Sequence, residues 1–230
     1  MGVVLITGAN RGIGLEFARQ YAEEGIEVIA TCKRPDEAKA LILLTDKFPN
    51  LSIEQLDMNS DEDLKALRLT LEKSDIQLDI LVSNAGVLLK ESFGEWTRQS
   101  FVDTFDINVI GTAMLAQSLI PSLSPNGKIV QLSSRLGSLD FGGEGIIDAD
   151  SYSMSKAALN MLATRLAVIV KESSQCVVSM SPGWVATDMG GTAATLQVNE
   201  SVFKMRRSIG ALTPSDSGRF IDNQGNPLPW

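Results

Sequence analysis

Tyr152 and Lys156 lie four residues apart in an apolar run with a helical pattern. Residues at this spacing share one face of a helix. A lysine ammonium beside a phenol favours the phenolate, which predicts that the pKa of Tyr152 is lowered from its ordinary value of about 10. A tyrosine altered in this way can exchange protons near neutral pH. Many helices contain this pair, so the rest of the chain must supply a reason for it.

The composition is that of one globular domain. The chain has 230 residues, 44% hydrophobic and 21% charged. Its net charge of −8 argues against a nucleic-acid surface, and no apolar run reaches the length of about 20 residues that a membrane helix needs. Residues 1–6 lack signal-peptide features and the two cysteines suit a reduced compartment, so we expect a cytoplasmic protein. The chain has no histidine, which excludes a Ser-His-Asp triad, and two cysteines predict no structural zinc site.

A glycine-rich turn connects the first predicted strand to a helical pattern, the context that a dinucleotide phosphate site requires. Gly8 permits a tight turn, Gly12 lets the backbone approach the pyrophosphate, and Gly14 allows close packing of the helix on the strand. The helix N-terminus then offers unpaired N–H groups to the phosphates. An ordinary strand-to-helix turn is the less favoured alternative. The predicted phosphate-binding residues are Gly8, Asn10, Arg11, Gly12, Ile13 and Gly14.

This turn, with Thr7 in front of it, resembles the N-terminal motif of the short-chain dehydrogenase/reductase family. Further motifs follow in the family's order: Asp57, Ser83-Asn84-Ala85-Gly86, Asn108, Ser134, Tyr152, Lys156 and Pro182-Gly183-Trp184-Val185-Ala186-Thr187. Ser83 replaces the first asparagine of the family's motif, which affects local support and not the fold. The resemblance covers almost the whole chain, and within the family it is strongest to the C-factor and sniffer-like carbonyl reductases.

The resemblance implies which further residues bind the cofactor. The family's aspartate at the end of the third strand holds the adenine amino group, and its Pro-Gly motif touches the carboxamide end of the nicotinamide. Trp184, directly after Pro-Gly, is expected to be a pocket wall, with plain core as the alternative. The implied contacts are Asp57, Met58, Asn84, Ala85, Gly86, Tyr152, Lys156, Pro182, Gly183, Trp184, Val185 and Thr187.

The end of the second predicted strand, residues 26–31, indicates which dinucleotide binds. An NAD enzyme places an acid about 20 residues beyond the glycines, where it binds the ribose. This chain has Lys33 and Arg34 there and no acid before Asp36. With Arg11, they can surround a 2′-phosphate through charge-assisted hydrogen bonds. We therefore predict NADP(H) in preference to NAD(H); the alternative is a solvated basic turn.

The resemblance also implies four catalytic residues: Asn108, Ser134, Tyr152 and Lys156. The family's serine follows the fifth strand and hydrogen-bonds the substrate oxygen, which assigns Ser134, with Ser133 as the second choice. The family's asparagine helps to hold a water that relays protons to the lysine, which assigns Asn108. From the sequence alone, a structural asparagine bonded to a neighbouring loop would be favoured there.

We predict one α/β domain over residues 1–230, a Rossmann-type doubly wound sheet of about seven parallel strands with helices on both faces. The expected strands are residues 2–6, 26–31, 51–56, 78–82, 127–132, 175–180 and 218–221, and the expected helices include 35–47, 60–73, 99–120 and 152–170. Ser60 is the expected N-cap of its helix, with Asp63 as the reciprocal capping partner. Residues 140–150 are expected to form a flexible loop and residues 189–205 a substrate flap. The pocket is expected to include Leu88, Arg135, Phe141 and Trp184.

These features predict an oxidoreductase that transfers hydride between NADP(H) and a small carbonyl or alcohol, with Tyr152 as the proton donor. The alternative is a C-factor-like signalling or NADP(H)-sensing protein whose turnover is incidental. The complete catalytic set favours the enzyme. The family implies a homodimer or homotetramer packed through helices 99–120 and 152–170, and no nucleic-acid, membrane or metal partner is expected.

Overall fold

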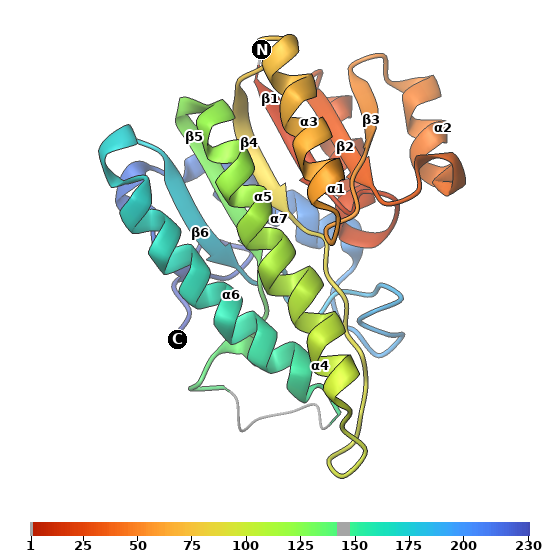
Figure 1. The fold of residues 1–230 in the computed structure, drawn as a ribbon, viewed down its shortest axis with the longest axis vertical. Coiled ribbons are helices and arrows are strands. Elements are labelled where there is room, and N and C mark those ends of the chain that lie inside the picture. The colour runs from red at the N-terminus through yellow and green to blue at the C-terminus, as the bar shows by residue number, and fades with distance from the viewer. Residues whose placement is uncertain (1, 142–147) are drawn as a thin grey trace.

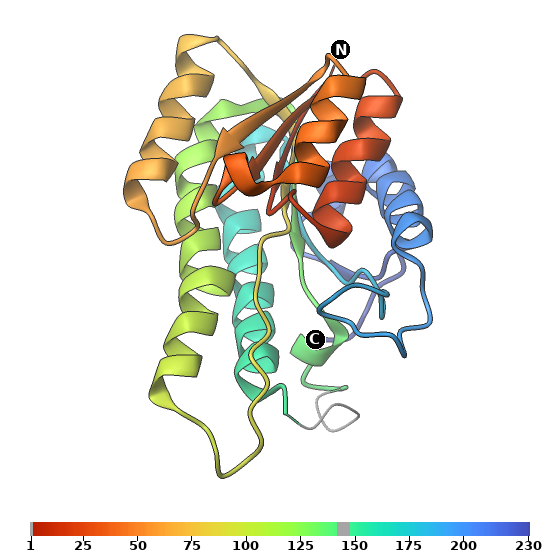
Figure 2. The same cartoon turned by 90° about the vertical axis from the view of Figure 1, so that its right-hand side faces the viewer.

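The computed structural model describes residues 2–141 and 148–230. A central sheet lies between two layers of helices (Figures 1 and 2). The loops that follow the carboxyl ends of the central strands gather at one end of the molecule, the lower end in Figure 2. The loop expected at residues 140–150 falls partly outside the described residues, at 142–147.

The described residues form one sheet of seven parallel strands in the order β3-β2-β1-β4-β5-β6-β7. The strands are β1 (Val3–Thr7), β2 (Glu27–Cys32), β3 (Leu51–Gln55), β4 (Leu78–Ser83), β5 (Leu123–Leu132), β6 (Cys176–Met180) and β7 (Phe220–Ile221). The strand order reverses between β1 and β4, which is where a doubly wound sheet binds its ligand. The predicted fold class is confirmed.

Helices cover both faces of this sheet. The helices are α1 (Gly12–Glu23), α2 (Lys39–Lys47), α3 (Asp61–Lys73), α4 (Arg98–Phe105), α5 (Thr112–Leu119), α6 (Asp150–Ile169) and α7 (Val198–Ala211). Short 3-10 turns lie at Pro35–Glu37, Ile120–Ser122, Arg135–Gly137, Lys171–Ser173 and Pro214–Asp216. Helices α3, α5 and α6 lie on the face turned to the viewer in Figure 1, and α1, α2 and α7 lie on the opposite face.

The strands have continuous apolar runs because both of their faces are buried. In β1, Val4 and Ile6 pack with Phe17 of α1, whereas Leu5 points to the other face and packs with Leu115 of α5. All five side chains are almost completely buried. Burial of each large apolar side chain contributes about 1.5–3 kcal/mol, so both cores hold the sheet in place and fix which strand ends meet at the cleft.

Two strand boundaries differ from the prediction. Strand β5 begins at Leu123, ahead of the predicted residues 127–132, and its pairing with β4 shifts register between Leu78 and Ile80. Because of this shift, Leu123 at the start of β5 also pairs with β4. Strand β7 has two residues of the predicted 218–221, because Gly218 has a φ of +84° that no regular strand accommodates.

The helix predicted over residues 99–120 contains a π-helical segment. Helix α4 continues directly into the π turn Asp106–Gly111 and then into α5. A Cβ at Gly111 would lie 2.4 Å from the carbonyl oxygen of Met58, so a glycine is required where this turn meets the loop after β3. Asn108 lies within the same turn and is completely buried. Such turns often occur at functional sites.

The predicted cap of α3 is half confirmed. The Ser60 side chain accepts from the N–H of Asp63 at 3.1 Å. The prediction that the Asp63 carboxylate accepts from the backbone N–H of Ser60 was wrong. The carboxylate accepts from the N–H of Asp57 at 2.8 Å instead. The carboxylate therefore fixes the backbone at the end of β3, where Asp57 was predicted to bind the cofactor.

The structure narrows the flap expected at residues 189–205. Helix α7 begins at Val198, and Val202 and Met205 are completely buried against the α1 layer. These two residues belong to the core of the domain. The segment that can cover a ligand therefore ends before α7.

Candidate active site

The glycine turn after β1 has the backbone that its sequence predicts. Gly8 and Gly12 have φ of +63° and +54°, a region that favours glycine. A Cβ at Gly14 would lie 2.5 Å from the Gly8 oxygen and from the side-chain nitrogen of Asn84. Helix α1 begins at Gly12, and the Arg11 side chain does not cap it. Its first N–H groups are therefore available to an anion.

Thr7 and Asn84 tie this turn to the neighbouring turn after β4. The Thr7 hydroxyl accepts from the N–H groups of Asn84 and Ala85, both at 3.0 Å. The Asn84 amide donates to the oxygens of Thr7 and Gly8 at 2.8 and 3.1 Å. The buried Ser83 hydroxyl has no partner among the described residues, so Thr7 and Asn84 supply the support that was in doubt at Ser83. Sequence reasoning did not assign Thr7, although its hydroxyl directly before Gly8 was the available signal.

A cleft of about 730 Å³ runs along the carboxyl ends of the central strands. It brings together most of the predicted residues from seven separate segments of the chain. Every predicted cofactor residue except Gly14 and Arg34 lines it, as does Ser134. Gly14 is a packing position, and Asn108 lies behind the wall. The lining also includes Lys90 and Asp188, which were not predicted as site residues.

Tyr152 and Lys156 form the deep end of the cleft. Both lie on the inner face of α6 and are almost completely buried. The Lys156 Nζ donates to the carbonyl oxygen of Leu132, at the end of β5, at 2.7 Å. The same Nζ is 5.4 Å from the centroid of the Tyr152 ring. The predicted pairing on one helix face is thus present, with the ammonium anchored to the sheet.

The predicted direction of the Tyr152 pKa shift was wrong for this structure. Burial raises the pKa of Tyr152 to about 12, although the nearby Ser134 hydroxyl works in the opposite direction. Burial also lowers the pKa of Lys156 to about 8. Desolvation outweighs the expected attraction, because the charged forms of both groups lose water in the same enclosed place. Tyr152 is therefore a neutral phenol at neutral pH, the form that can donate a proton.

The structure distinguishes Ser134 from Ser133. The Ser133 hydroxyl is buried and donates to the side-chain oxygen of Asn160 on α6 at 2.7 Å. Its proton is therefore already used in a bond to α6. The Ser134 hydroxyl accepts from the N–H of Leu136 at 3.2 Å, lines the cleft together with Tyr152 and acts to lower the pKa of the Tyr152 phenol. Ser134 can therefore present its hydroxyl to the same atom as Tyr152.

The Asn108 side chain holds the loop that follows Gly86. Its oxygen accepts from the N–H of Val87 at 2.8 Å, and its nitrogen donates to the Val87 oxygen at 2.9 Å and to the Ser155 hydroxyl at 3.0 Å. A Cβ at Gly86 would lie 3.1 Å from the Asn108 side-chain oxygen and 3.6 Å from the Lys156 Nζ. These are the bonds of a structural asparagine, and they place Asn108 directly behind Lys156. Its role in a proton relay stays a prediction.

The three cations predicted at the other end of the cleft each pair with a carboxylate. Lys33 pairs with Asp57 at 2.6 Å. Arg11 pairs with Asp188 at 3.3 Å and Arg34 with Glu37 at 3.2 Å. Although burial opposes it, the Lys33 ammonium and the Asn59 N–H hold the pKa of Asp57 below its ordinary value. Lys33 and Arg11 line the cleft and Arg34 does not, so the predicted cluster of three is a pair.

The wall beside Tyr152 and Ser134 is largely apolar. Trp184 lines it, with its indole nitrogen donating to the Gly190 oxygen at 2.8 Å, and this confirms a pocket wall. Leu88, Leu136 and Met189 line it as well. Two residues expected in the pocket, Arg135 and Phe141, are not in the lining, because they stack on each other at 4.2 Å.

This fold and site define a class of protein. The family model for short chain dehydrogenase matches residues 2–197, and the chain belongs to this family. Within residues 2–141 and 148–230, no group of side chains forms a metal site. The same residues contain no helix long and apolar enough to cross a bilayer.

Individual relatives cover all or most of the chain. A carbonyl reductase from chicken fatty liver, solved with NADPH bound, is 32% identical over the whole of both chains, with a TM-score of 0.95. The carbonyl reductase Sniffer of D. melanogaster is 30% identical, also over the whole of both chains, with a TM-score of 0.93. C-signal of Myxococcus xanthus is 38% identical over 156 residues, which are 66% of this chain and 93% of that protein.

Proposed function

We propose that the protein is an NADP(H)-dependent carbonyl reductase, which transfers hydride between the nicotinamide and a carbonyl or alcohol. The observation that carries the proposal is that Ser134, Tyr152 and Lys156 line the same cleft, with the Lys156 Nζ 5.4 Å from the centroid of the Tyr152 ring. Two hydroxyl groups that line one cleft can both hydrogen-bond a single carbonyl oxygen. The similarity to two carbonyl reductases supports the same reaction class.

The proposed roles follow from the positions of the groups. When bound, NADPH supplies the hydride. Ser134 hydrogen-bonds the carbonyl oxygen, and the neutral Tyr152 phenol donates the proton to it. Lys156, held by Leu132, places a positive charge beside the phenolate that this transfer creates. Asn108 keeps the loop after Gly86 against Lys156.

The preference for NADP(H) rests on the other end of the cleft. Arg11 and Lys33 line it, and both are exposed enough to reach a 2′-phosphate. The chain places no acid directly after β2, where a carboxylate would repel that phosphate. The NADPH-bound chicken reductase supports the same choice.

The test is turnover of a panel of aldehydes, ketones and quinones with NADPH. Tyr152→Phe keeps the ring and removes the proton, so we expect kcat to fall by about 10²- to 10⁴-fold. Ser134→Ala should also lower kcat, whereas the matched change Ser133→Ala removes the bond to Asn160 and should mainly lower the melting temperature. Reduction by Tyr152→Phe at the parent rate would exclude the mechanism.

A second candidate is a signalling or NADP(H)-sensing protein with incidental turnover, and the likeness to C-signal is the observation that favours it. The complete set of Asn108, Ser134, Tyr152 and Lys156 supports chemistry, because a sensor needs no buried proton donor. The same panel separates the two proposals. Tight NADPH binding without turnover of any carbonyl would favour the sensor.

We also propose a homodimer or homotetramer packed through α4, α5 and α6. These helices lie side by side on the face seen in Figure 1. These helices and the π turn between α4 and α5 expose large apolar side chains: Val102, Ile110, Met154, Met161, Val168 and Ile169. A second copy would cover such a surface. Light scattering at micromolar concentration should give at least twice the chain mass of 24.8 kDa, and the mass of a single chain would contradict this proposal.

A further inference from the structure

The wall that begins at Pro182 is a closed loop standing on the first turn of α7. Its ends are joined by two backbone bonds: the Ala186 N–H donates to the Leu196 oxygen at 2.9 Å, and the Leu196 N–H donates to the Trp184 oxygen at 3.1 Å. Between these bonds lie pocket-lining residues of the apolar wall. Helix α7 begins at Val198, so the first turn of α7 sets where the loop stands.

That first turn is bonded in two directions. The Ser201 hydroxyl, completely buried, donates to the oxygen of Pro182 in the cleft wall at 2.7 Å. On the other side, the Gln20 amide of α1 donates to the backbone oxygen of Asn199 at 3.0 Å. A continuous path of short contacts therefore leads from α1 through α7 to the cleft wall.

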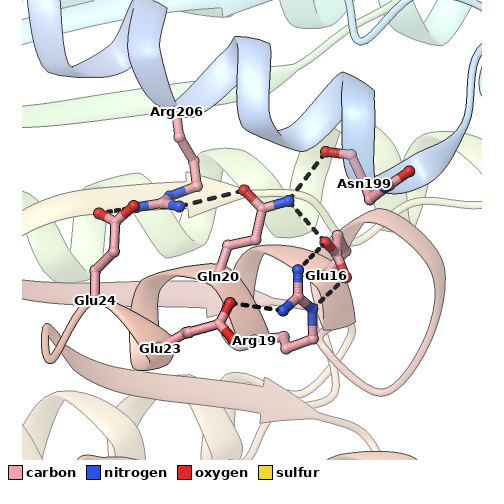
Figure 3. A network of polar contacts seen from close by, with 7 residues as sticks. All are labelled: Glu16, Arg19, Gln20, Glu23, Glu24, Asn199 and Arg206. Carbon is pink, nitrogen blue, oxygen red and sulfur yellow. Dashed lines mark hydrogen bonds and ion pairs between the residues drawn. The ribbon is translucent and has the colours of Figure 1, made fainter.

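Gln20 is the centre of the polar network between α1 and α7 shown in Figure 3. Its nitrogen also donates to Glu16 at 2.7 Å, and its oxygen accepts from Arg206 at 3.2 Å. Arg206 pairs with Glu24 and lies over the Tyr21 ring at 4.4 Å. Gln20 is 6% exposed, and a buried amide with its partners satisfied resists displacement.

The same two segments meet again inside the cleft. Helix α1 begins at Gly12 of the phosphate-binding turn. A Cβ at Gly12 would lie 3.5 Å from the Thr187 methyl group, and Arg11 pairs with Asp188. The loop and the glycine turn therefore lie close together inside the cleft, and the network around Gln20 is a second, buried connection between the same two segments.

We propose that Gln20 and Ser201 are positioning residues that fix the cleft wall of residues 182–196 relative to the glycine turn through the first turn of α7. Neither residue lines the cleft. The kinetic consequence rests on the proposed function, whereas the structural consequence does not. Loosening the attachment should raise the KM of both NADPH and the carbonyl, because both contact this wall, and should leave kcat nearly unchanged.

The test uses the full chain with two variants and one control. Gln20→Met keeps the side-chain length and removes its hydrogen bonds, while Glu16 keeps Arg19 and Arg206 keeps Glu24. Ser201→Ala removes one bond, while the Pro182 oxygen keeps Asn223 as a donor at 3.1 Å. The matched control is Arg19→Met, because Arg19 pairs with Glu16 and Glu23, both on α1.

Hydrogen exchange of the Ala186 and Leu196 amides reports how readily the two bonds that close the loop open, and it requires no turnover. We expect exchange about tenfold faster in Gln20→Met and Ser201→Ala, and unchanged in Arg19→Met. We expect both KM values to rise about fivefold in the two variants, with kcat within about twofold. If Gln20→Met fails to fold, Ser201→Ala carries the same test with a smaller perturbation.

Two results are decisive. A lower melting temperature in both variants, with loop exchange and KM unchanged, would show that the network only stabilises the packing of α1 and α7, and would overturn the proposal. Faster loop exchange in a protein that reduces no carbonyl would support the positioning role and reject the proposed reaction.

Discussion

At the Tyr152 end of the cleft the charged and polar groups are buried and bonded to the backbone, whereas at the Lys33 end they are exposed and bonded to one another. Lys156 is 4% exposed and donates to the Leu132 oxygen. The Lys33 side chain is 64% exposed and pairs with Asp57. These two lysines of one cleft are therefore held in different physical environments.

The difference teaches what each end can do. Burial raises the pKa of Tyr152 and lowers the pKa of Lys156, so both groups favour their neutral forms. This prepares them for proton transfer. It also means that a charge on either group lowers the stability of the folded protein. An exposed ion pair such as Lys33 with Asp57 contributes about 0–1 kcal/mol and is screened by salt. Changes at the Tyr152 end should therefore alter chemistry and stability together, and changes at the Lys33 end should alter cofactor choice alone.

The largest expected effect that tests this comparison is that of Lys156→Met. Activity should fall by about 10³-fold, because no charge remains beside the phenolate. The unfolding free energy at pH 7 should nevertheless rise by about 1 kcal/mol or more, because a buried ammonium with a lowered pKa opposes folding. Denaturant titration of both proteins provides the measurement.

The difference in unfolding free energy between the parent and Lys156→Met should depend on pH in a definite direction, which provides a control. Unfolded Lys156 keeps its proton up to its ordinary pKa of 10.5, whereas folded Lys156 loses it at about 8. Between these values the unfolded state binds more protons, so the stability of the parent should rise with pH relative to Lys156→Met. A constant difference would show that Lys156 is not desolvated.

Lys33→Asp should have a smaller effect, confined to the cofactor. We expect kcat/KM for NADPH to fall about 10- to 100-fold while the value for NADH is kept or rises, because a new carboxylate beside Asp57 repels a 2′-phosphate. The melting temperature should change little, since the side chain is exposed. The matched control is Arg34→Asp: Arg34 pairs with Glu37 outside the cleft and should change the preference much less. Equal effects of the two changes would contradict the assignment of Lys33.

The fold and most of the cleft could be predicted because they depend on patterns local in the sequence. Apolar runs, glycine spacing and the order of motifs placed Gly8, Asn84 and Tyr152 at one edge of a parallel sheet, and the structure confirms that placement. The π turn around Asn108 could not be found in this way. Apolar residues spaced by three and four positions predict an α-helix. A single wider π turn leaves this spacing almost unchanged, so the sequence pattern does not reveal it.

What the sequence could not give is the environment of each side chain. A basic run predicts Arg34 beside Lys33, but whether Arg34 turns to the cleft or to Glu37 depends on the next turn of the chain. The pKa of Tyr152 was predicted from its neighbour Lys156, whereas it is decided by the amount of water that the whole fold excludes. Burial is a sum over many distant residues, so it is known only once the structure is known.

The smallest expected effect is a shift in the pH profile. Tyr152, with a pKa of about 12, stays protonated through the neutral and moderately alkaline range, whereas Lys156 loses its charge near pH 8. We therefore expect kcat/KM for carbonyl reduction to fall as pH rises above about 8, because this ratio reports the free enzyme. In Lys156→Arg the guanidinium stays charged, so the residual activity should remain level to about pH 9.5. An alkaline limb at the same pH in both proteins would assign the limb to another group, and would mean that the buried charge beside Tyr152 does not control proton transfer.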